Sequence, residues 1–186
     1  MKKQIYIALL RGINVGGHNI LKMEVLRKVL QENGFESVKT YIQSGNIIFK
    51  TEKSKPIQLI EKISEIIEKE FDFKVPVIVL TIEQLKSIIL DNPYLKESSK
   101  SEPFMHVTFL SDTPNSKTIA DIVANNKDDD ELRLGKKVLY LYCPNSYSKS
   151  KLVNTFLEKK LKLHTTTRNW KTTLKLLEIA EAMECN

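Results

Sequence analysis

The feature that most constrains this chain is the order of its apolar patterns, which occurs twice along the sequence. A short continuous apolar run predicts a strand buried on both faces, and apolar residues three and four apart predict an amphipathic helix. In the first half, these rules predict strand, helix, strand, strand, helix, strand, helix. The expected strands are 3–11, 37–43, 46–51 and 75–81, and the expected helices are Met23 to a stop at Gly34, 56–71 and 82–90.

The second half repeats this order, although the two halves share no clear residue-level identity. Its expected strands are 104–110, 131–134, 137–143 and 164–167, and its expected helices are 116–126, 150–163 and 170–183. Six elements in the order βαββαβ are typical of a ferredoxin-like fold. The sequence therefore predicts an α+β protein with two ferredoxin-like halves, 1–92 and 103–186, and an extra C-terminal helix. The boundary is expected in 91–103, which contains two prolines and several serines.

Composition is compatible with this organisation and limits the class of protein. The chain has 186 residues, 41% of them hydrophobic, which is enough for two small packed halves. A net charge of +6 favours anionic partners, although scattered lysines on solvated helix faces would give the same excess. The first apolar run is interrupted at Arg11, and Cys143 and Cys185 fit no metal or redox spacing. We expect a cytoplasmic protein without a membrane partner, a metal or a cofactor.

Residues 11–17 read Arg-Gly-Ile-Asn-Val-Gly-Gly and contain three of the six glycines. A loop between a strand and a helix places backbone N–H groups at a helix N-terminus, where anions bind. Several glycines in one loop also indicate a backbone with positive φ. The segment lacks the patterns of a P-loop and of a dinucleotide-binding loop. An anion-binding loop and a purely conformational loop both remain possible at this point.

The predicted topology brings a second polar segment to this loop. In a ferredoxin-like sheet the first and third strands are adjacent and antiparallel, so the end of strand 3–11 meets the start of strand 46–51. An arginine, amides and a hydroxyl converging there would suit a polar or phosphorylated ligand. Alternatively, Ser44-Gly45-Asn46 is only a hairpin turn. The candidate binding residues are Arg11, Gly12, Asn14, Gly16, Gly17, Gln43, Ser44, Gly45 and Asn46.

A second polar cluster lies at the start of the last helix. It comprises Thr167, Arg168, Asn169 and Trp170, and Lys151 is a further candidate on the preceding segment. Asn169 or Thr167 can cap the helix, and Arg168 would bring a positive charge to its positive end, which favours an anion there. Trp170 can stack on a base or pack in the core. Lys151 can belong to a helix cap with a solvated face.

Taken together, these segments resemble a known bacterial family. Arg11 to Gly17, Tyr41 to Asn46, Ser150-Lys151-Leu152 and Thr167 to Trp170 resemble the family of domain of unknown function 1697 over essentially the whole chain. A minor departure is Thr173, where members typically carry valine. The resemblance implies an α+β fold with two ferredoxin-like halves and no established activity.

Catalytic groups are harder to find than binding groups. His106 lies in an apolar strand and is expected to be a core residue, and Ser44 would need a base for which His18 is the local candidate. The acidic run 128–131 is typical of a solvated turn. Two hypotheses follow. The first is binding of nucleic acid or another phosphate-bearing ligand. The alternative is an enzyme acting on a small phosphorylated or nucleotide substrate, with Arg11 and Arg168 as anion clamps.

Overall fold

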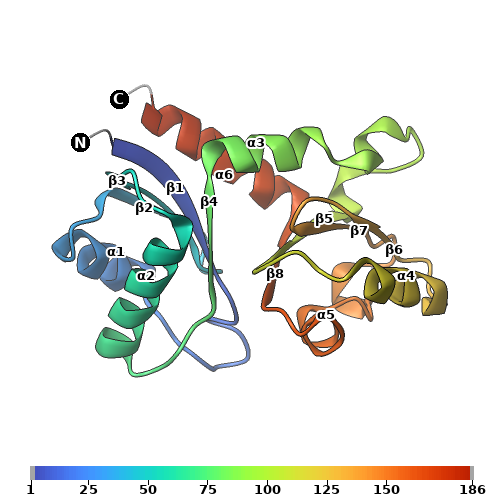
Figure 1. The fold of residues 1–186 in the computed structure, drawn as a ribbon, viewed down its shortest axis with the longest axis horizontal. Coiled ribbons are helices and arrows are strands. Elements are labelled where there is room, and N and C mark those ends of the chain that lie inside the picture. Colours follow the sequence, from blue (N-terminus) through green and yellow to red (C-terminus); the bar gives the residue numbers. More distant parts are fainter. Residues whose placement is uncertain (1–2, 185–186) are drawn as a thin grey trace. The chain divides into compact units, whose positions relative to one another are not determined.

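The computed structural model describes residues 3–184, which form two compact units (Figure 1). The first unit contains residues 3–85 and 176–184, and the second contains residues 86–175. The divisions fall inside helices α3 (Ile82–Leu90) and α6 (Trp170–Glu184), not in residues 91–103. Segment 91–103 belongs to the second unit because it is tied to that unit's sheet. The ring of Tyr94 is fully buried, Arg133 lies over it at 4.6 Å, and Lys100 forms an ion pair with Glu131.

The first unit is built on a four-stranded antiparallel sheet with the strand order β2-β3-β1-β4. Leu9 of β1 pairs with Asn46 of β3, so these strands are adjacent and antiparallel as predicted. Gly34 follows the first helix with φ +88°, the left-handed conformation of a helix-ending glycine. The elements are β1 (Lys3–Leu10), α1 (Met23–Glu32), β2 (Glu36–Tyr41), β3 (Asn46–Glu52), α2 (Pro56–Phe71) and β4 (Val77–Thr81).

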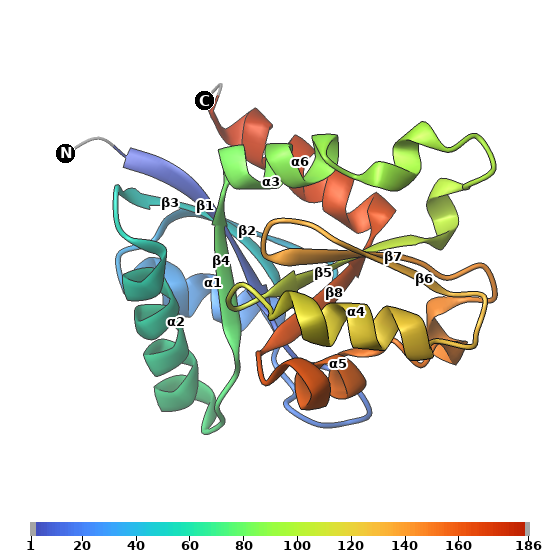
Figure 2. The same ribbon diagram turned by 45° about the vertical axis from the view of Figure 1, so that its right-hand side comes forward.

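Helices α1 and α2 lie on the same side of this sheet (Figures 1 and 2). The core between them includes alternate residues of β1, namely Tyr6, Ala8 and Leu10. The other alternate residues, such as Ile7 and Leu9, are also fully buried. The prediction of a first strand buried on both faces is therefore confirmed.

The second unit has an equivalent antiparallel sheet with the order β6-β7-β5-β8. Helices α4 and α5 cover one face, with Leu139, Leu141 and Leu157 in the core. The last strand ends at Asn169, beyond the predicted 164–167, so Arg168 lies within the sheet. The elements are β5 (Met105–Leu110), α4 (Ser116–Asn125), β6 (Glu131–Leu134), β7 (Val138–Tyr142), α5 (Asn154–Leu161) and β8 (Thr165–Asn169).

Residues 3–184 thus form an α+β structure with two four-stranded antiparallel sheets and six α-helices. None of the helices in these residues combines the length and the hydropathy needed to cross a membrane. Cys185, the second of the two cysteines, lies outside the described residues.

Candidate functional site

The glycine loop, defined as residues 11–22, meets the turn between β2 and β3. The backbone N–H of Leu10 donates to the carbonyl of Gly45 at 2.8 Å. The side-chain amide of Asn14 donates to the carbonyl of Gln43 at 2.9 Å. The antiparallel pairing of β1 and β3 places these segments side by side. The predicted convergence of the two polar segments is therefore present in the first unit.

Asn14 fixes the shape of the glycine loop. Its Nδ2 donates to the carbonyls of Leu21 and Gln43, both at 2.9 Å, and its Oδ1 accepts from the N–H of Leu21 at 2.8 Å. Its φ is +53°, a conformation that asparagine tolerates better than most residues. Asn19 adds a hydrogen bond from Nδ2 to the carbonyl of Gly12 at 3.1 Å. The loop is therefore held by its own asparagines.

The glycines of this region serve two different purposes. A Cβ on Gly45 would lie 2.6 Å from the Cβ of Leu10, so close packing requires a glycine there. A Cβ on Gly12 or Gly17 would meet open space. Glycine is favoured at these two positions because their φ values, +70° and +78°, are positive. Gly16 also has a positive φ, and both Gly16 and Gly17 are exposed. The tip of the loop thus presents bare backbone to solvent.

The turn residues also have internal partners. Asn46 is fully buried, and its Nδ2 donates to the carbonyl of Tyr41 at 3.0 Å and to the Oγ of Ser44 at 2.9 Å. These bonds close the β2–β3 turn. The alternative prediction, that Ser44-Gly45-Asn46 forms a hairpin turn, agrees with this arrangement.

The second predicted cluster lies in the other unit, where its threonines form a buried network. Asn154 at the start of α5 accepts hydrogen bonds through Oδ1 from the hydroxyls of Thr165 and Thr167, at 2.8 and 2.9 Å. The hydroxyl of Thr167 also lies 2.8 Å from that of Thr108 on β5. The network joins β5, β8 and α5. Asn154 was not among the predicted site residues, because nothing in the local sequence distinguishes it from a solvent-exposed asparagine.

The other residues of this cluster are mostly inside the protein. Arg168 is only 7% exposed, and its Nη1 donates to the hydroxyl of Thr166 at 2.8 Å and to the carbonyl of Thr167 at 2.9 Å. Asn169 caps α6 by accepting from the N–H of Thr172 at 2.8 Å. Trp170 is 2% exposed, so its ring occupies the core, which was one of the two predicted alternatives.

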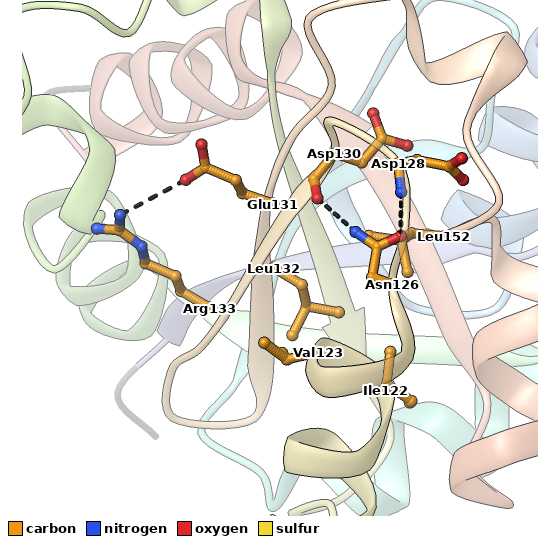
Figure 3. A pocket seen from close by; sticks show the side chains of 9 residues that line it. All are labelled: Ile122, Val123, Asn126, Asp128, Asp130, Glu131, Leu132, Arg133 and Leu152. Carbon is orange, nitrogen blue, oxygen red and sulfur yellow. Dashed lines mark hydrogen bonds and ion pairs between the residues drawn. The ribbon is translucent and has the colours of Figure 1, made fainter.

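Lys151 precedes Leu152, which lines a groove beside β6 (Figure 3). The Nζ of Lys151 is 3.1 Å from a carboxylate oxygen of Asp128, and the lysine side chain is largely exposed. The groove encloses about 310 Å³ between α4 and β6. Asp130 lines the groove and is only 8% exposed. The prediction that the whole acidic run 128–131 forms a solvated turn is therefore wrong for Asp130. The spacing of two residues between Asp130 and the buried Leu132 is the signal that this aspartate shares the inner face.

Burial shifts the pKa of two titratable groups in the second unit, Cys143 and His106. Burial raises the pKa of the Cys143 thiol to about 12, which keeps the thiol protonated at neutral pH. His106 is stacked on Tyr147 with ring centroids 4.9 Å apart, and burial lowers its pKa. Its Nδ1 is 3.2 Å from the carbonyl of Phe104. Within residues 3–184, no cluster of three or more His, Cys, Asp or Glu side chains is placed to hold a metal ion.

Comparison with known proteins identifies the family. The family described as "Protein of unknown function (DUF1697)" matches residues 3–140, so this chain belongs to the DUF1697 family, as the motifs indicated. The structure is similar to that of the conserved bacterial protein SP0830 from Streptococcus pneumoniae. The two are 28% identical in sequence with a TM-score of 0.76, and the match covers 96% of this chain and 99% of the other. No curated protein matches the sequence.

Proposed function

We propose that this protein is a binding module for a phosphate-bearing ligand, either nucleic acid or a phosphorylated small molecule, and that the glycine loop holds the phosphate. The main observation behind the proposal is that Gly16 and Gly17, both with positive φ, form the exposed tip of this loop. Bare glycine backbone lets N–H groups approach an anion closely.

The hydrogen bonds within the loop support this proposal. The three bonds of Asn14 and the bond from Asn19 hold the loop in shape without a ligand. A preorganised loop loses little conformational entropy when it binds, which favours affinity. Arg11 provides a cationic residue at the start of the loop, and the net charge of +6 favours an anionic partner.

The contribution of the second cluster is limited by burial. Trp170 at 2% exposure has no free ring face for stacking on a base, and Arg168 is 7% exposed. We therefore base the proposal on Arg11, Gly12, Asn14, Gly16 and Gly17, with the β2–β3 turn as their support. The proposal assigns no catalytic role to Cys143, whose thiol pKa is raised by burial, or to Ser44, whose hydroxyl closes the β2–β3 turn with Asn46.

We also infer that each unit is ferredoxin-like. The order βαββαβ and the strand order 2-3-1-4 in each sheet support this assignment. A loop after the first strand of such a unit is anchored by the neighbouring third strand, as Leu10 and Gly45 are here.

The test is a titration of isotopically labelled protein followed by NMR, with inorganic phosphate, a mononucleotide and a single-stranded hexanucleotide at low and moderate salt. We expect saturable shifts of the Gly16 and Gly17 amide signals. Arg11→Ala should weaken binding several-fold and reduce the slope of log affinity against log salt by about 1. Lys53→Ala is the matched control, because Lys53 is exposed at the other end of β3.

The outcomes separate the alternatives. Binding that is tight only for the hexanucleotide and weakens with salt identifies nucleic acid as the ligand class. Saturable binding of the mononucleotide identifies a small phosphorylated ligand. Glycine signals that do not move with any of the three probes, or equal losses in Arg11→Ala and Lys53→Ala, would refute the proposal.

A further inference from the structure

Strand β6 has an open edge. It lies at the end of the second sheet, and within residues 3–184 no strand pairs with its outer side. The N–H of Gly135 donates to the carbonyl of Val138 at 2.9 Å, so these two residues form a hydrogen-bonded pair. Along two antiparallel strands, hydrogen-bonded residue pairs alternate with pairs that share no hydrogen bond. The register therefore places Arg133 in a bonded pair with β7. The backbone N–H and C=O groups of Leu132 and Leu134 then point away from β7, where an incoming strand can pair with them.

The β6 groove lies beside this open edge. Its apolar lining comes from Ile122 and Val123 of α4, from Leu132 of β6 and from Leu152. Val123 is 48% exposed, so part of this apolar lining faces solvent. Figure 3 shows Leu132 directed toward Val123, whereas the side chain of Arg133 extends to the opposite side of the strand. An added strand would therefore place alternate side chains against an apolar surface.

The charge of the groove indicates which side chains fit it. Asp130 lines the groove at 8% exposure, and within the described residues it forms no ion pair with a lysine or an arginine, although its charge interacts with the His106 ring. Its charge also contributes to the raised pKa of the Cys143 thiol. Asp128 also lines the groove, and its partner is the exposed Lys151. A buried carboxylate is stabilised by a cationic partner, so an incoming lysine or arginine would complete the site.

We propose that the β6 groove binds an extended peptide segment with basic side chains, which adds to β6 as a further strand. The backbone groups of Leu132 and Leu134 bond the peptide main chain, the apolar lining receives its uncharged side chains, and Asp130 and Asp128 receive its cations. This interaction is separate from the proposed phosphate site, which lies in the other unit, and neither proposal depends on the other.

The experiment measures binding of fluorescein-labelled hexapeptides by fluorescence anisotropy with the full chain. The first peptide is Lys-Thr-Val-Thr-Lys-Thr, so that lysine and valine face the groove together and threonine faces away from it. A second peptide carries glutamate in place of both lysines, and a third is the lysine peptide with alternate main-chain amides methylated. We expect saturable binding of the first peptide and at least about tenfold weaker binding of the other two, because they lack the charge or the strand-pairing donors.

Variants of the protein locate the site. Leu134→Pro removes an outward N–H at an exposed position and should weaken binding of the lysine peptide about tenfold or more. Asp130→Asn and Asp128→Asn should each weaken it several-fold. Asp121→Asn is the matched control, because Asp121 is an exposed acidic residue on α4 that does not line the groove. Circular dichroism establishes that each variant is folded.

Equal affinity for the methylated and unmethylated lysine peptides would overturn the proposal, since the attraction would then be electrostatic only. The absence of saturable binding would also overturn it and would leave β6 as a short, charged edge that discourages association. The methylated peptide needs no protein variant, so the test remains decisive even if Leu134→Pro does not fold.

Discussion

Replacement of Asn14 by alanine should destabilise the first unit through the loss of the bonds that shape the glycine loop. Asn14 makes two hydrogen bonds with Leu21 and one with Gln43. A neutral hydrogen bond contributes about 1 kcal/mol net, and the exposed bond to Gln43 contributes less. Alanine at φ +53° adds a cost of about 1 kcal/mol. We expect Asn14→Ala to lower the free energy of unfolding by about 3 kcal/mol.

Two further substitutions separate these contributions. Asn14→Gly loses the same hydrogen bonds but accepts a positive φ, so it should be more stable than Asn14→Ala by about 1 kcal/mol. Asn14→Asp keeps an acceptor for the N–H of Leu21 but loses the two hydrogen bonds that Nδ2 of Asn14 donates to the carbonyls of Leu21 and Gln43. The N–H of Leu21 should therefore exchange with solvent faster in the alanine and glycine variants than in the aspartate variant.

The assay is urea denaturation combined with residue-resolved hydrogen exchange. Trp170 lies in the second unit, so its fluorescence follows that unit, and exchange of the β1 and α1 amides reports on the first. The reasoning is refuted if Asn14→Ala costs less than about 1 kcal/mol and the exchange of the Leu21 amide is unchanged. The loop would then be held by contacts other than the Asn14 side chain.

The remaining predictions concern packing, buried hydroxyls and pH. Gly45→Ala should lower the free energy of unfolding of the first unit by about 2–4 kcal/mol in urea denaturation. The new Cβ would lie 2.6 Å from the Cβ of Leu10, and alanine would have to adopt a φ of +75°. A loss below about 1 kcal/mol would contradict this prediction. Tyr140→Phe should cost the second unit about 1 kcal/mol, because the hydroxyl donates to the carbonyl of Ile88 at 2.8 Å. Tyr94→Phe should cost nothing, since the buried hydroxyl of Tyr94 has no hydrogen-bond partner among residues 3–184. A measurable loss of stability in Tyr94→Phe would count against this assignment. Burial raises the pKa of Tyr140 from its ordinary value of 10.0 to about 12, so the folded state favours the protonated phenol. The second unit should lose stability as pH rises from about 10 to about 12, and denaturation across this range should show a smaller loss for Tyr140→Phe.

The order of the secondary-structure elements could be predicted from the sequence because apolar spacing is a local property. Strand β1 was predicted as 3–11 and found as Lys3–Leu10, and α2 was predicted and found as Pro56–Phe71. The largest differences are at short polar elements. The helix predicted as 150–163 is α5, Asn154–Leu161, and β8 extends through the polar residues to Asn169. Polar strand residues carry no apolar alternation, so pairing with β5 alone defines this strand.

The candidate site could be predicted only in part. The meeting of the glycine loop with the β2–β3 turn followed from topology, and the structure contains it. That Asn14 would bond Leu21 and Gln43, 7 and 29 residues away, did not follow from any local pattern. The phosphate ligand remains a prediction.

The sequence by itself determined the α+β class and the repeated element order, because these depend on the local period of apolar residues. Only the tertiary structure decided that Arg168, Trp170 and Asp130 are buried while Gly16 and Gly17 are exposed. Burial depends on which element packs against each face, and that is set by contacts between residues far apart in the chain. A polar side chain therefore shows its role only when its distant neighbours are in place.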